Sequence, residues 1–353
     1  MQKIVVTGMG IVSALGSNVN ENLTALQAKK SGIAPLRYLK TSHTEFPVGE
    51  VKMTDEEMAR NLNIAENELT TRTSLMGMLA VREALESANI GYKTKGISNP
   101  TIAFINGTTV GGMDKSEQFY IDFLENDSKN AYISKHDCGA CTEMIADYFG
   151  IFSSVDTIST ACSSAANAIL LGAELLKNNR ADIVVAGGSE CITKFHLNGF
   201  NTLMILDKEQ CRPFDATRAG LNLGEGAAYV VMQREEDVKQ SHISIFLAGY
   251  ANTCDAFHQT ASSPNGEGAY LAMKKALENA GLQISDIDYI NAHGTGTPNN
   301  DGSEGVAIMR LFGDSIPPVS SIKSFTGHTT SAAGSVEAVI SMLALQHNFI
   351  PVN

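Results

Sequence analysis

Cys162 stands where a β-branched run gives way to an alanine-rich run, in the stretch DTISTACSSAANAILLGAELL that begins at Asp156. The pattern predicts a strand that closes at Ile158 and a helix that begins at Ser163. A thiol at a helix N-terminus meets unpaired backbone N–H groups and the positive end of the helix dipole, which stabilise a thiolate. A lone cysteine is more often a small core residue, so Cys162 needs partners to count as a nucleophile.

Three such partners follow predicted strands in the last quarter of the chain. His293 lies in NAHGTGTPNND, and Lys323 and His328 lie in SIKSFTGHTTSAAG. Loops after the strands of an α/β fold meet at one edge of the sheet, where active sites form. A thiol, two imidazoles and an ammonium group at that edge predict a catalytic centre with Cys162 as its nucleophile.

The elements that must position these residues alternate along the chain. Short β-branched runs are separated by segments of helical period, which indicates an α/β fold with helices packed on a mostly parallel sheet. We expect helices over 73–89, 163–176, 267–280 and 332–346. The expected strands are IVVTG, TIAFING, VDTIST, DIVVAGG, AAYVVM, DYINAH and PVSSIK.

The two halves of the sequence resemble each other. AVREALESANI, from Ala80, matches AMKKALENAGL, from Ala272, and each is followed by a strand and a Gly/Thr-rich loop. The segment around Cys162 pairs in the same way with the segment around Lys323 and His328, so the pattern predicts a duplicated α/β unit. DIVVAGG and AAYVVM have no counterpart after the last helix. The second half is therefore incomplete. Either the native chain continues, which we expect to take about 45 to 60 residues past Asn353, or this protein lacks the closing strands of one sheet and leaves an edge that something else covers.

Composition excludes several classes of protein. The chain has 353 residues, 43% of them hydrophobic, and a formal net charge of -12. An acidic chain without a basic cluster is not expected to bind nucleic acid. No apolar run of about 18 residues occurs and the start reads as a strand, so we expect a cytoplasmic protein without membrane association.

Six scattered cysteines in such a protein are expected to be reduced thiols. Cys138 and Cys141 form a CGAC pair, but a structural zinc site needs a second pair of ligands and the sequence offers none at suitable spacing. We therefore predict no metal site.

TACSSA, NAHGTGTPNND and SIKSFTGH, in this order, resemble the three active-site motifs of the β-ketoacyl-[acyl carrier protein] synthases. The resemblance extends over nearly the whole chain, through IVVTGMGIVSALG, ADIVVAGGSE and RPFDATRAGLNLGEGAA, and is strongest to the type II condensing enzymes. It implies a thiolase-like α/β fold with duplicated βαβαβαββ halves in α-β-α-β-α layers, the second half incomplete. The implied domains are 1–241, with the nucleophile, and 242–353, with the histidines and the lysine.

The resemblance assigns roles to the candidate residues. Cys162 corresponds to the acyl-carrying nucleophile, and His293 and His328 correspond to the pair of histidines that acts in decarboxylation. Lys323 is the family's lysine next to them. In this role the two histidines should be neutral, so that their N–H groups can stabilise an enolate.

Four further residues match the family's pattern after the first histidine. Asp301 and Glu304 occupy its acidic positions, and Glu304 is the expected ionic partner of Lys323. Thr295 and Thr297 match the threonines that hydrogen-bond the phosphopantetheine arm of the substrate.

The implied reaction is a decarboxylative Claisen condensation in fatty acid or polyketide chain elongation. An acyl group on Cys162 is joined to malonyl-[acyl carrier protein], and the product is 3-oxoacyl-[acyl carrier protein]. No metal or redox cofactor is implied, since the substrates travel on the 4'-phosphopantetheine of acyl carrier protein. The implied partners are this carrier and a second subunit, either in a homodimer or in a heterodimer with a chain-length-factor-like chain. Lys129 and Arg72 are candidates for basic residues that meet the acidic carrier.

Two alternatives stay open on the sequence. A non-catalytic chain-length-factor-type subunit would resemble the same family, but such subunits characteristically lack the cysteine found at position 162. A thiolase acting on coenzyme A esters would share the fold but use a second cysteine as base, where this chain has His328. One feature of the family is missing: no glycine-rich loop with an aromatic gate, which supplies its second oxyanion donor, follows His347.

Overall fold

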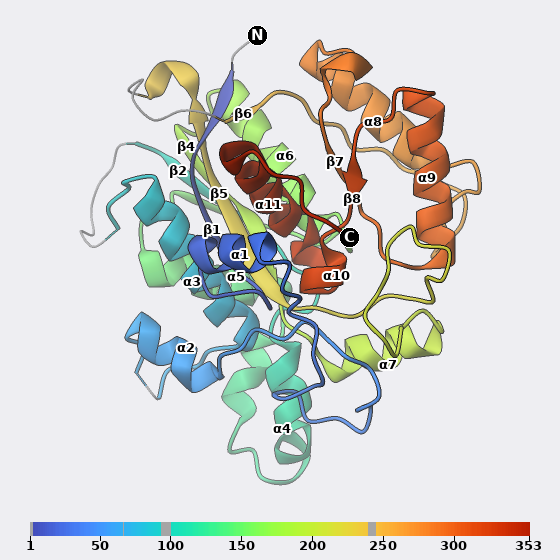
Figure 1. The fold of residues 1–353 in the computed structure, drawn as a ribbon. Coiled ribbons are helices and arrows are strands. Elements are labelled where there is room, and N and C mark those ends of the chain that lie inside the picture. The colour runs from blue at the N-terminus through green and yellow to red at the C-terminus, as the bar shows by residue number, and fades with distance from the viewer. Residues whose placement is uncertain (1–2, 66, 93–99, 239–244) are drawn as a thin grey trace.

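A six-stranded sheet forms the centre of the computed structural model, which describes residues 3–65, 67–92, 100–238 and 245–353. Its strand order is β3-β2-β4-β5-β1-β6, and β7 and β8 form a second, two-stranded parallel sheet (Figure 1). The expected boundary between residues 241 and 242 lies outside the described residues. The strands are β1 (Ile4–Val12), β2 (Ile102–Gly107), β3 (Ser154–Ile158), β4 (Ile183–Glu190), β5 (Gly226–Arg234), β6 (Phe246–Leu247), β7 (Ile290–Asn291) and β8 (Val319–Ser320).

The helices surround both sheets. They are α1 (Val19–Gln27), α2 (Asp55–Leu62), α3 (Arg72–Ser87), α4 (Met113–Glu125), α5 (Cys138–Phe149), α6 (Ser164–Lys177), α7 (Lys194–Thr202), α8 (Glu267–Ala280), α9 (Pro298–Phe312), α10 (Lys323–Thr326) and α11 (Ala333–His347). All seven predicted strands and all four predicted helices are confirmed. Among the described helices, none combines the length and hydrophobicity that crossing a lipid bilayer requires.

The expectation of a mostly parallel sheet is wrong. Among the described strands of the large sheet, only the β2–β3 and β2–β4 pairs are parallel, whereas β4–β5, β5–β1 and β1–β6 are antiparallel. Strand direction depends on how the chain returns to the sheet, and neither hydrophobic period nor composition reports that path. The long connection from β4 through α7 brings the chain back in the opposite direction.

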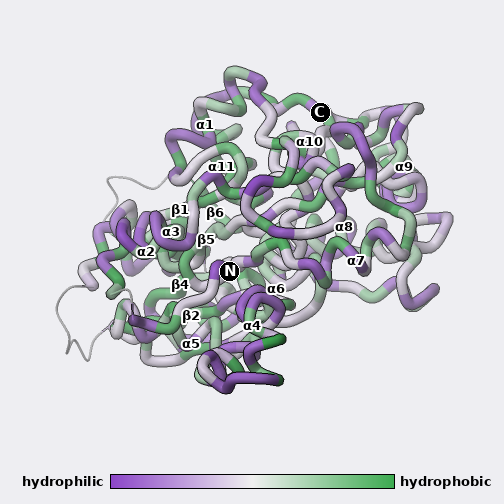
Figure 2. Tube along the Cα trace, turned by 90° about the horizontal axis from the view of Figure 1, so that it is seen from below, coloured by the Kyte–Doolittle hydropathy of each residue, from purple (hydrophilic) through white to green (hydrophobic). Residues whose placement is uncertain are grey.

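Helices cover both faces of the large sheet. Alternate residues of its strands point to opposite faces, so that Phe104 packs with α3 and α5 while Ile105 packs with α6 and α11. The short second sheet and helices α8 and α9 lie beyond α6 and α11 (Figure 1). Strands β1, β2, β4 and β5 are mostly buried and run through the interior (Figure 2). These are the α-β-α-β-α layers that the sequence led us to expect.

The duplication is visible in the packing of two equivalent glycines. A Cβ atom on Gly8, in β1, would lie 2.3 Å from the carbonyl oxygen of Ala84 in α3. A Cβ atom on Gly249, just after β6, would lie 2.5 Å from the carbonyl oxygen of Ala276 in α8. Both contacts leave no room for a side chain. The matched alanine-rich helices therefore pack closely against equivalent segments in the two halves.

Arg72 is buried at the start of α3, which contradicts its suggested role in meeting the carrier. Its guanidinium contacts both oxygens of Glu225 at 2.6–3.0 Å and Asp55 at 3.0 Å. Glu225 follows Gly224, whose N–H donates to the carbonyl of His328. The ion pair therefore anchors the segment that holds one of the candidate histidines.

We predict that Arg72→Met lowers the free energy of unfolding by about 3–5 kcal/mol, because it leaves the Glu225 carboxylate buried without its cation. Denaturant unfolding measures the effect. Arg180→Met, at an exposed position, is the control and should change stability by less than about 0.5 kcal/mol. Adding Glu225→Gln to Arg72→Met should restore part of the loss, and no recovery would contradict the ion-pair explanation.

Candidate active site

The candidate residues gather where β3, β7 and β8 end. Cys162 lies between β3 and α6, His293 follows β7, and Lys323 opens α10 after β8. The residue before the thiol, Ala161, has a left-handed backbone with φ of 52°, which a residue with a Cβ adopts at a cost of about 1 kcal/mol. This sharp turn sets Cys162 just ahead of α6, which begins at Ser164 with Ser163 as its N-cap. The predicted helix start is therefore right to within one residue.

The thiol and the two imidazoles are neighbours. The Sγ atom of Cys162 lies 3.0 Å from Nε2 of His328. The rings of His293 and His328 are 5.1 Å apart between centroids and nearly perpendicular. The structure thus brings together three residues that are far apart in the sequence, in the arrangement that the motifs predicted.

His328 is held by its backbone and by its second ring nitrogen. Its N–H donates to the carbonyl of Asn222 at 2.8 Å, and its carbonyl accepts from Gly224 at 2.9 Å. The backbone N–H of Thr330 donates to Nδ1 of His328 at 3.2 Å. Since Nδ1 accepts a hydrogen bond, the neutral ring carries its proton on Nε2, which then points toward the sulfur of Cys162.

Lys323 fixes the other imidazole. Its Nζ lies 3.3 Å from Nδ1 of His293 and donates to the carbonyl of the same residue at 2.6 Å. The ammonium group can only donate, so His293 too carries its proton on Nε2. Both rings therefore present an N–H donor on the Nε2 side.

The carboxylate that pairs with Lys323 is Glu337 of α11, and the expected pair between Lys323 and Glu304 is wrong. Glu304 instead accepts from the backbone N–H groups of His293 at 2.7 Å and Gly294 at 2.8 Å. Glu304 thus orients the loop of His293, while Glu337 neutralises the lysine. Burial raises the pKa of Glu304, and these two backbone N–H groups act against that rise.

Sequence reasoning missed Glu337. The signal was present, since Glu337 is the only acidic residue in α11, whose sequence is AGSVEAVISMLALQH. An isolated carboxylate on a helix that packs in the interior requires a cationic or hydrogen-bonding partner.

The remaining predicted residues support the loop between β7 and α9. Asp301 accepts from the backbone N–H of Phe214 at 2.8 Å and of Gly296 at 3.2 Å. The hydroxyls of Thr295 and Thr297 are 2.9 Å apart, and Thr297 caps α9. Both threonines are buried, and their expected contact with phosphopantetheine stays a prediction.

The two candidate histidines are neutral near pH 7. Burial is the largest effect and lowers the pKa of both His293 and His328 well below its usual value, and the charge of Lys323 lowers both further. Neutral rings with a proton on Nε2 meet the condition that the enolate-stabilising role requires.

We predict that condensation by protein already acylated on Cys162 changes by less than about twofold between pH 7.5 and 6.0. Histidines of ordinary pKa, about 6.5, would be about three quarters protonated at pH 6.0. The lowered pKa values keep His293 and His328 neutral over this whole range. Single-turnover rates across the range test this, and a rate that halves near pH 6.5 would contradict it.

The expectation that the helix end holds Cys162 as a thiolate is wrong for the resting protein. Burial is the dominant effect and raises the pKa of the thiol, although the charge of Lys323 and the residue's own backbone N–H lower it. The thiol must therefore lose its proton in the course of the reaction.

The sulfur and the imidazole nitrogens are also a possible set of metal ligands. One such atom from each of Cys162, His293 and His328 lies within 4.8 Å of the other two. A metal needs a free lone pair on each nitrogen, whereas both Nε2 atoms carry protons in the state that their Nδ1 partners favour. The hydrogen bonding thus suits donation to an anion better than coordination of a cation.

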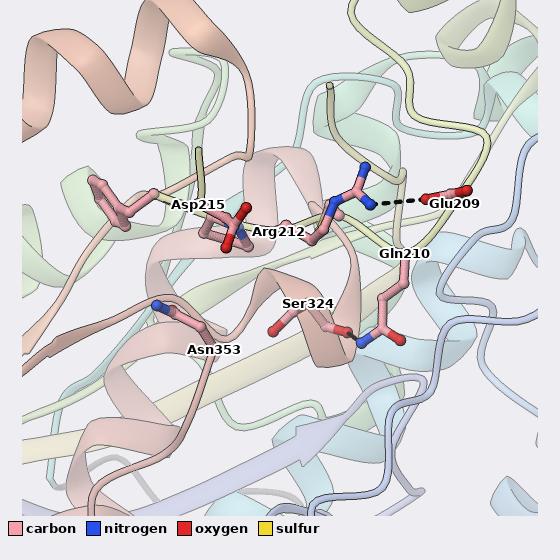
Figure 3. A pocket seen from close by; sticks show the side chains of 9 residues that line it. Glu209, Gln210, Arg212, Asp215, Ser324 and Asn353 are labelled. Carbon is pink, nitrogen blue, oxygen red and sulfur yellow. Dashed lines mark hydrogen bonds and ion pairs between the residues drawn. The ribbon is translucent and has the colours of Figure 1, made fainter. Parts of the chain in front are cut away.

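A pocket of about 610 Å³ adjoins the lysine loop. It is lined by residues 209–215 together with Ser324 and Asn353 (Figure 3). Gln210 donates to the carbonyl of Ser324 at 2.7 Å, and the carbonyl of Lys323 accepts from the thiol of Cys211 at 3.2 Å. The wall of the pocket is therefore connected directly to the loop that carries Lys323.

Known protein families and relatives match this protein along nearly its whole chain. The model of the beta-ketoacyl synthase N-terminal domain matches residues 1–238, and that of the C-terminal domain matches residues 245–353. The 3-oxoacyl-[acyl-carrier-protein] synthase 2 of Coxiella burnetii is 33% identical over 365 residues, which span 99% of this chain and 87% of that protein.

Solved structures give the same result. The ishigamide ketosynthase/chain length factor structure matches with a TM-score of 0.91 and 28% identity, over 99% of this chain and 87% of that one. The ketosynthase ApeO in complex with its chain length factor ApeC, from Xenorhabdus doucetiae, matches with a TM-score of 0.84 and 29% identity, over 99% and 86%.

Proposed function

Because the chain belongs to the β-ketoacyl synthase family, we propose that it joins an acyl group held on Cys162 to malonyl-[acyl carrier protein] and releases 3-oxoacyl-[acyl carrier protein]. The observation that carries the proposal is the contact of 3.0 Å between the thiol of Cys162 and the imidazole of His328, with the ring of His293 beside it.

The first step loads the nucleophile. The sulfur of Cys162 attacks the carbonyl carbon of an acyl thioester on the carrier, and the bond from that carbon to the carrier's sulfur breaks. The proton of the Cys162 thiol ends on the released carrier thiol. Stabilisation of the developing oxyanion requires preorganised N–H donors, and the backbone N–H of Cys162 is one.

The second step forms the new carbon–carbon bond. Malonyl-[acyl carrier protein] loses its carboxylate as carbon dioxide, and the Nε2–H groups of His293 and His328 donate to the oxygen of the resulting enolate. The enolate carbon attacks the thioester on Cys162, whose carbon–sulfur bond breaks. The freed sulfur takes up one proton from solvent, and this restores the thiol. Lys323 acts as a positioning charge that Glu337 balances, and no step uses a metal or redox cofactor.

The geometry favours this reaction over the two alternatives. A chain-length-factor-type subunit does not need a thiol held against an imidazole, whereas here Cys162 and His328 are in contact. A thiolase of this fold needs a second cysteine as base, and the residue in contact with Cys162 is a histidine. Elongation of a carrier-bound acyl group with release of carbon dioxide is expected of the synthase and of neither alternative.

We also propose two partners, an acyl carrier protein and a second subunit of this fold. β3 is an edge strand of the large sheet, and Ser154, Val155 and Asp156 along it are exposed. An exposed edge strand is open to pairing with another chain. Light scattering after size-exclusion chromatography, with the chain alone and with a co-expressed chain-length-factor-like protein, would distinguish a homodimer from a heterodimer.

The direct test of the reaction uses malonyl carrier and a panel of acyl carriers of different chain length. We expect a carrier-bound product two carbons longer than the acyl group supplied, with release of carbon dioxide, and mass spectrometry detects it. Acylated protein without any elongated product would support the loading step and contradict condensation. The absence of both would contradict the proposed function.

A further inference from the structure

A second buried carboxylate lies at the end of β4. Glu190 is 0% exposed, and four groups of the loop after β2 donate to it. Its Oε1 accepts from the hydroxyl of Thr108 at 2.8 Å and the N–H of Val110 at 3.1 Å, and its Oε2 accepts from the N–H of Thr109 at 2.8 Å and from that residue's hydroxyl. Among the described residues, no lysine or arginine forms an ion pair with Glu190.

Close glycine contacts bring this carboxylate to the candidate site. A Cβ atom on Gly188 would lie 2.7 Å from the carbonyl oxygen of Gly107, 2.9 Å from Cβ of Ala165 and 3.2 Å from the carbonyl oxygen of Ser331. Ala165 is in the first turn of α6, after Cys162, and Ser331 follows His328. The end of β4 is thus packed between the loop of the thiol and the loop of one imidazole.

The loop that Glu190 holds also contacts the strand before the thiol. The N–H of Thr108 donates to the carbonyl of Ile158, the last residue of β3, at 3.1 Å. A Cβ atom on Gly107 would lie 2.6 Å from the backbone nitrogen of Ala165. Displacement of the 108–110 loop would therefore disturb both ends of the short segment that presents Cys162.

Every group that contacts the carboxylate of Glu190 can donate to it. Each oxygen of Glu190 faces a backbone N–H, so a glutamine at this position would direct an amide N–H against one of them. A buried anion without a cation is costly, and its field acts on every titratable group around it because the interior screens charge poorly. The groups within its electrostatic reach are Cys138 and Cys141 of α5, Cys162, Cys191, His196 of α7 and Tyr229 of β5.

We propose that Glu190 is a positioning residue of the Cys162 site: its carboxylate, which accepts from four donors of the 108–110 loop, fixes that loop against the segment that presents the thiol. Burial raises the pKa of the Cys162 thiol most, the charge of Lys323 lowers it, and the charge of Glu190 raises it as well, though less than burial and the charge of Glu337 do. The effect on the thiol is independent of the proposed function, whereas the effect on condensation rests on it.

The test is the pH dependence of alkylation at Cys162 by iodoacetamide, followed by peptide mass spectrometry to separate the six cysteines. Glu190→Gln removes the charge, and Glu190→Asp keeps it while shortening the side chain. We expect the alkylation midpoint to move to lower pH in Glu190→Gln, with a rate at pH 7 only about twofold to threefold higher, because burial and Glu337 act more strongly on the thiol. The midpoint should not move in Glu190→Asp, nor in Thr109→Val, which removes one hydroxyl donor.

These variants separate charge from loosened structure. A more open site raises the plateau rate at high pH without moving the midpoint, whereas loss of the charge moves the midpoint. An unchanged midpoint in Glu190→Gln, or an equal shift in Glu190→Asp, would overturn the charge effect on the thiol. Condensation by Glu190→Asp tests the positioning role: we expect about a tenfold to hundredfold loss from the displaced loop, against less than about threefold in Thr109→Val. Full activity in Glu190→Asp would overturn the positioning role, also where Glu190→Gln does not fold. If the unmodified protein does not condense, the proposed function fails while the alkylation result still stands.

Discussion

Cys162→Ala abolishes transfer of an acyl group from acyl carrier protein and lowers condensation by about 10⁴-fold or more, the size of loss expected when a covalent nucleophile is removed. The sulfur is the atom in contact with Nε2 of His328, and alanine offers no atom that can carry the acyl group. Intact-protein mass spectrometry after incubation with an acyl carrier measures the loss directly.

Cys254→Ala is the matched control, because Cys254 is an exposed free thiol. It should acquire one acyl group at the same rate as the unmodified protein. A Cys162→Ala protein that still gains one acyl group would place the nucleophile elsewhere and contradict the proposed mechanism. Thermal unfolding of both variants shows whether the fold is retained.

Local patterns in the sequence predicted the positions of the main strands and helices. The run around Cys162 changes from β-branched to alanine-rich residues where β3 ends and α6 begins, and the structure has this change within one residue. Ala84 and Ala276 occupy equivalent positions in the two matched helices, and in the structure they pack against Gly8 and Gly249, respectively. Local pattern was sufficient for the ends of the strands and helices, because these depend on residues close together in the chain.

Strand direction and charge pairing could not be obtained in this way. Two strands of equal hydrophobicity can run either way in a sheet, so the antiparallel pairs of β5 had no local signal. Glu304 lies near Lys323 in the expected site, but the orientation of α11 decides that Glu337 reaches the ammonium group. Which carboxylate pairs with Lys323 therefore depends on how helices that are distant in sequence pack together.

The protonation state of the Cys162 thiol could not be predicted from the local sequence either. A helix N-terminus favours the thiolate, and that part of the reasoning was sound. Burial of Cys162 opposes it and is the larger effect, and burial of a loop residue is a property of the assembled fold. The same burial acts on His293 in the direction that the reaction needs, since it keeps the ring neutral.

His293→Ala separates the two half-reactions. Acylation of Cys162 should continue at a rate within about threefold of the unmodified protein, because the imidazole in contact with the sulfur is that of His328. Condensation should fall by about a hundredfold to a thousandfold, the usual cost of one lost donor to a developing oxyanion. Single-turnover assays that start from acylated protein and malonyl carrier measure the second step alone.

His293→Asn tests whether the lost donor is the cause. The asparagine amide N–H reaches toward the position of Nε2 but falls about one bond short of it, so this variant should recover part of the rate lost in His293→Ala while both lose the ring that Lys323 contacts. Equal rates in the two variants would assign the loss to the disturbed lysine and not to the donor. A His293→Ala protein that loses acylation as severely as condensation would show that the imidazole acts before the enolate forms, and the division of labour between the two histidines would be wrong.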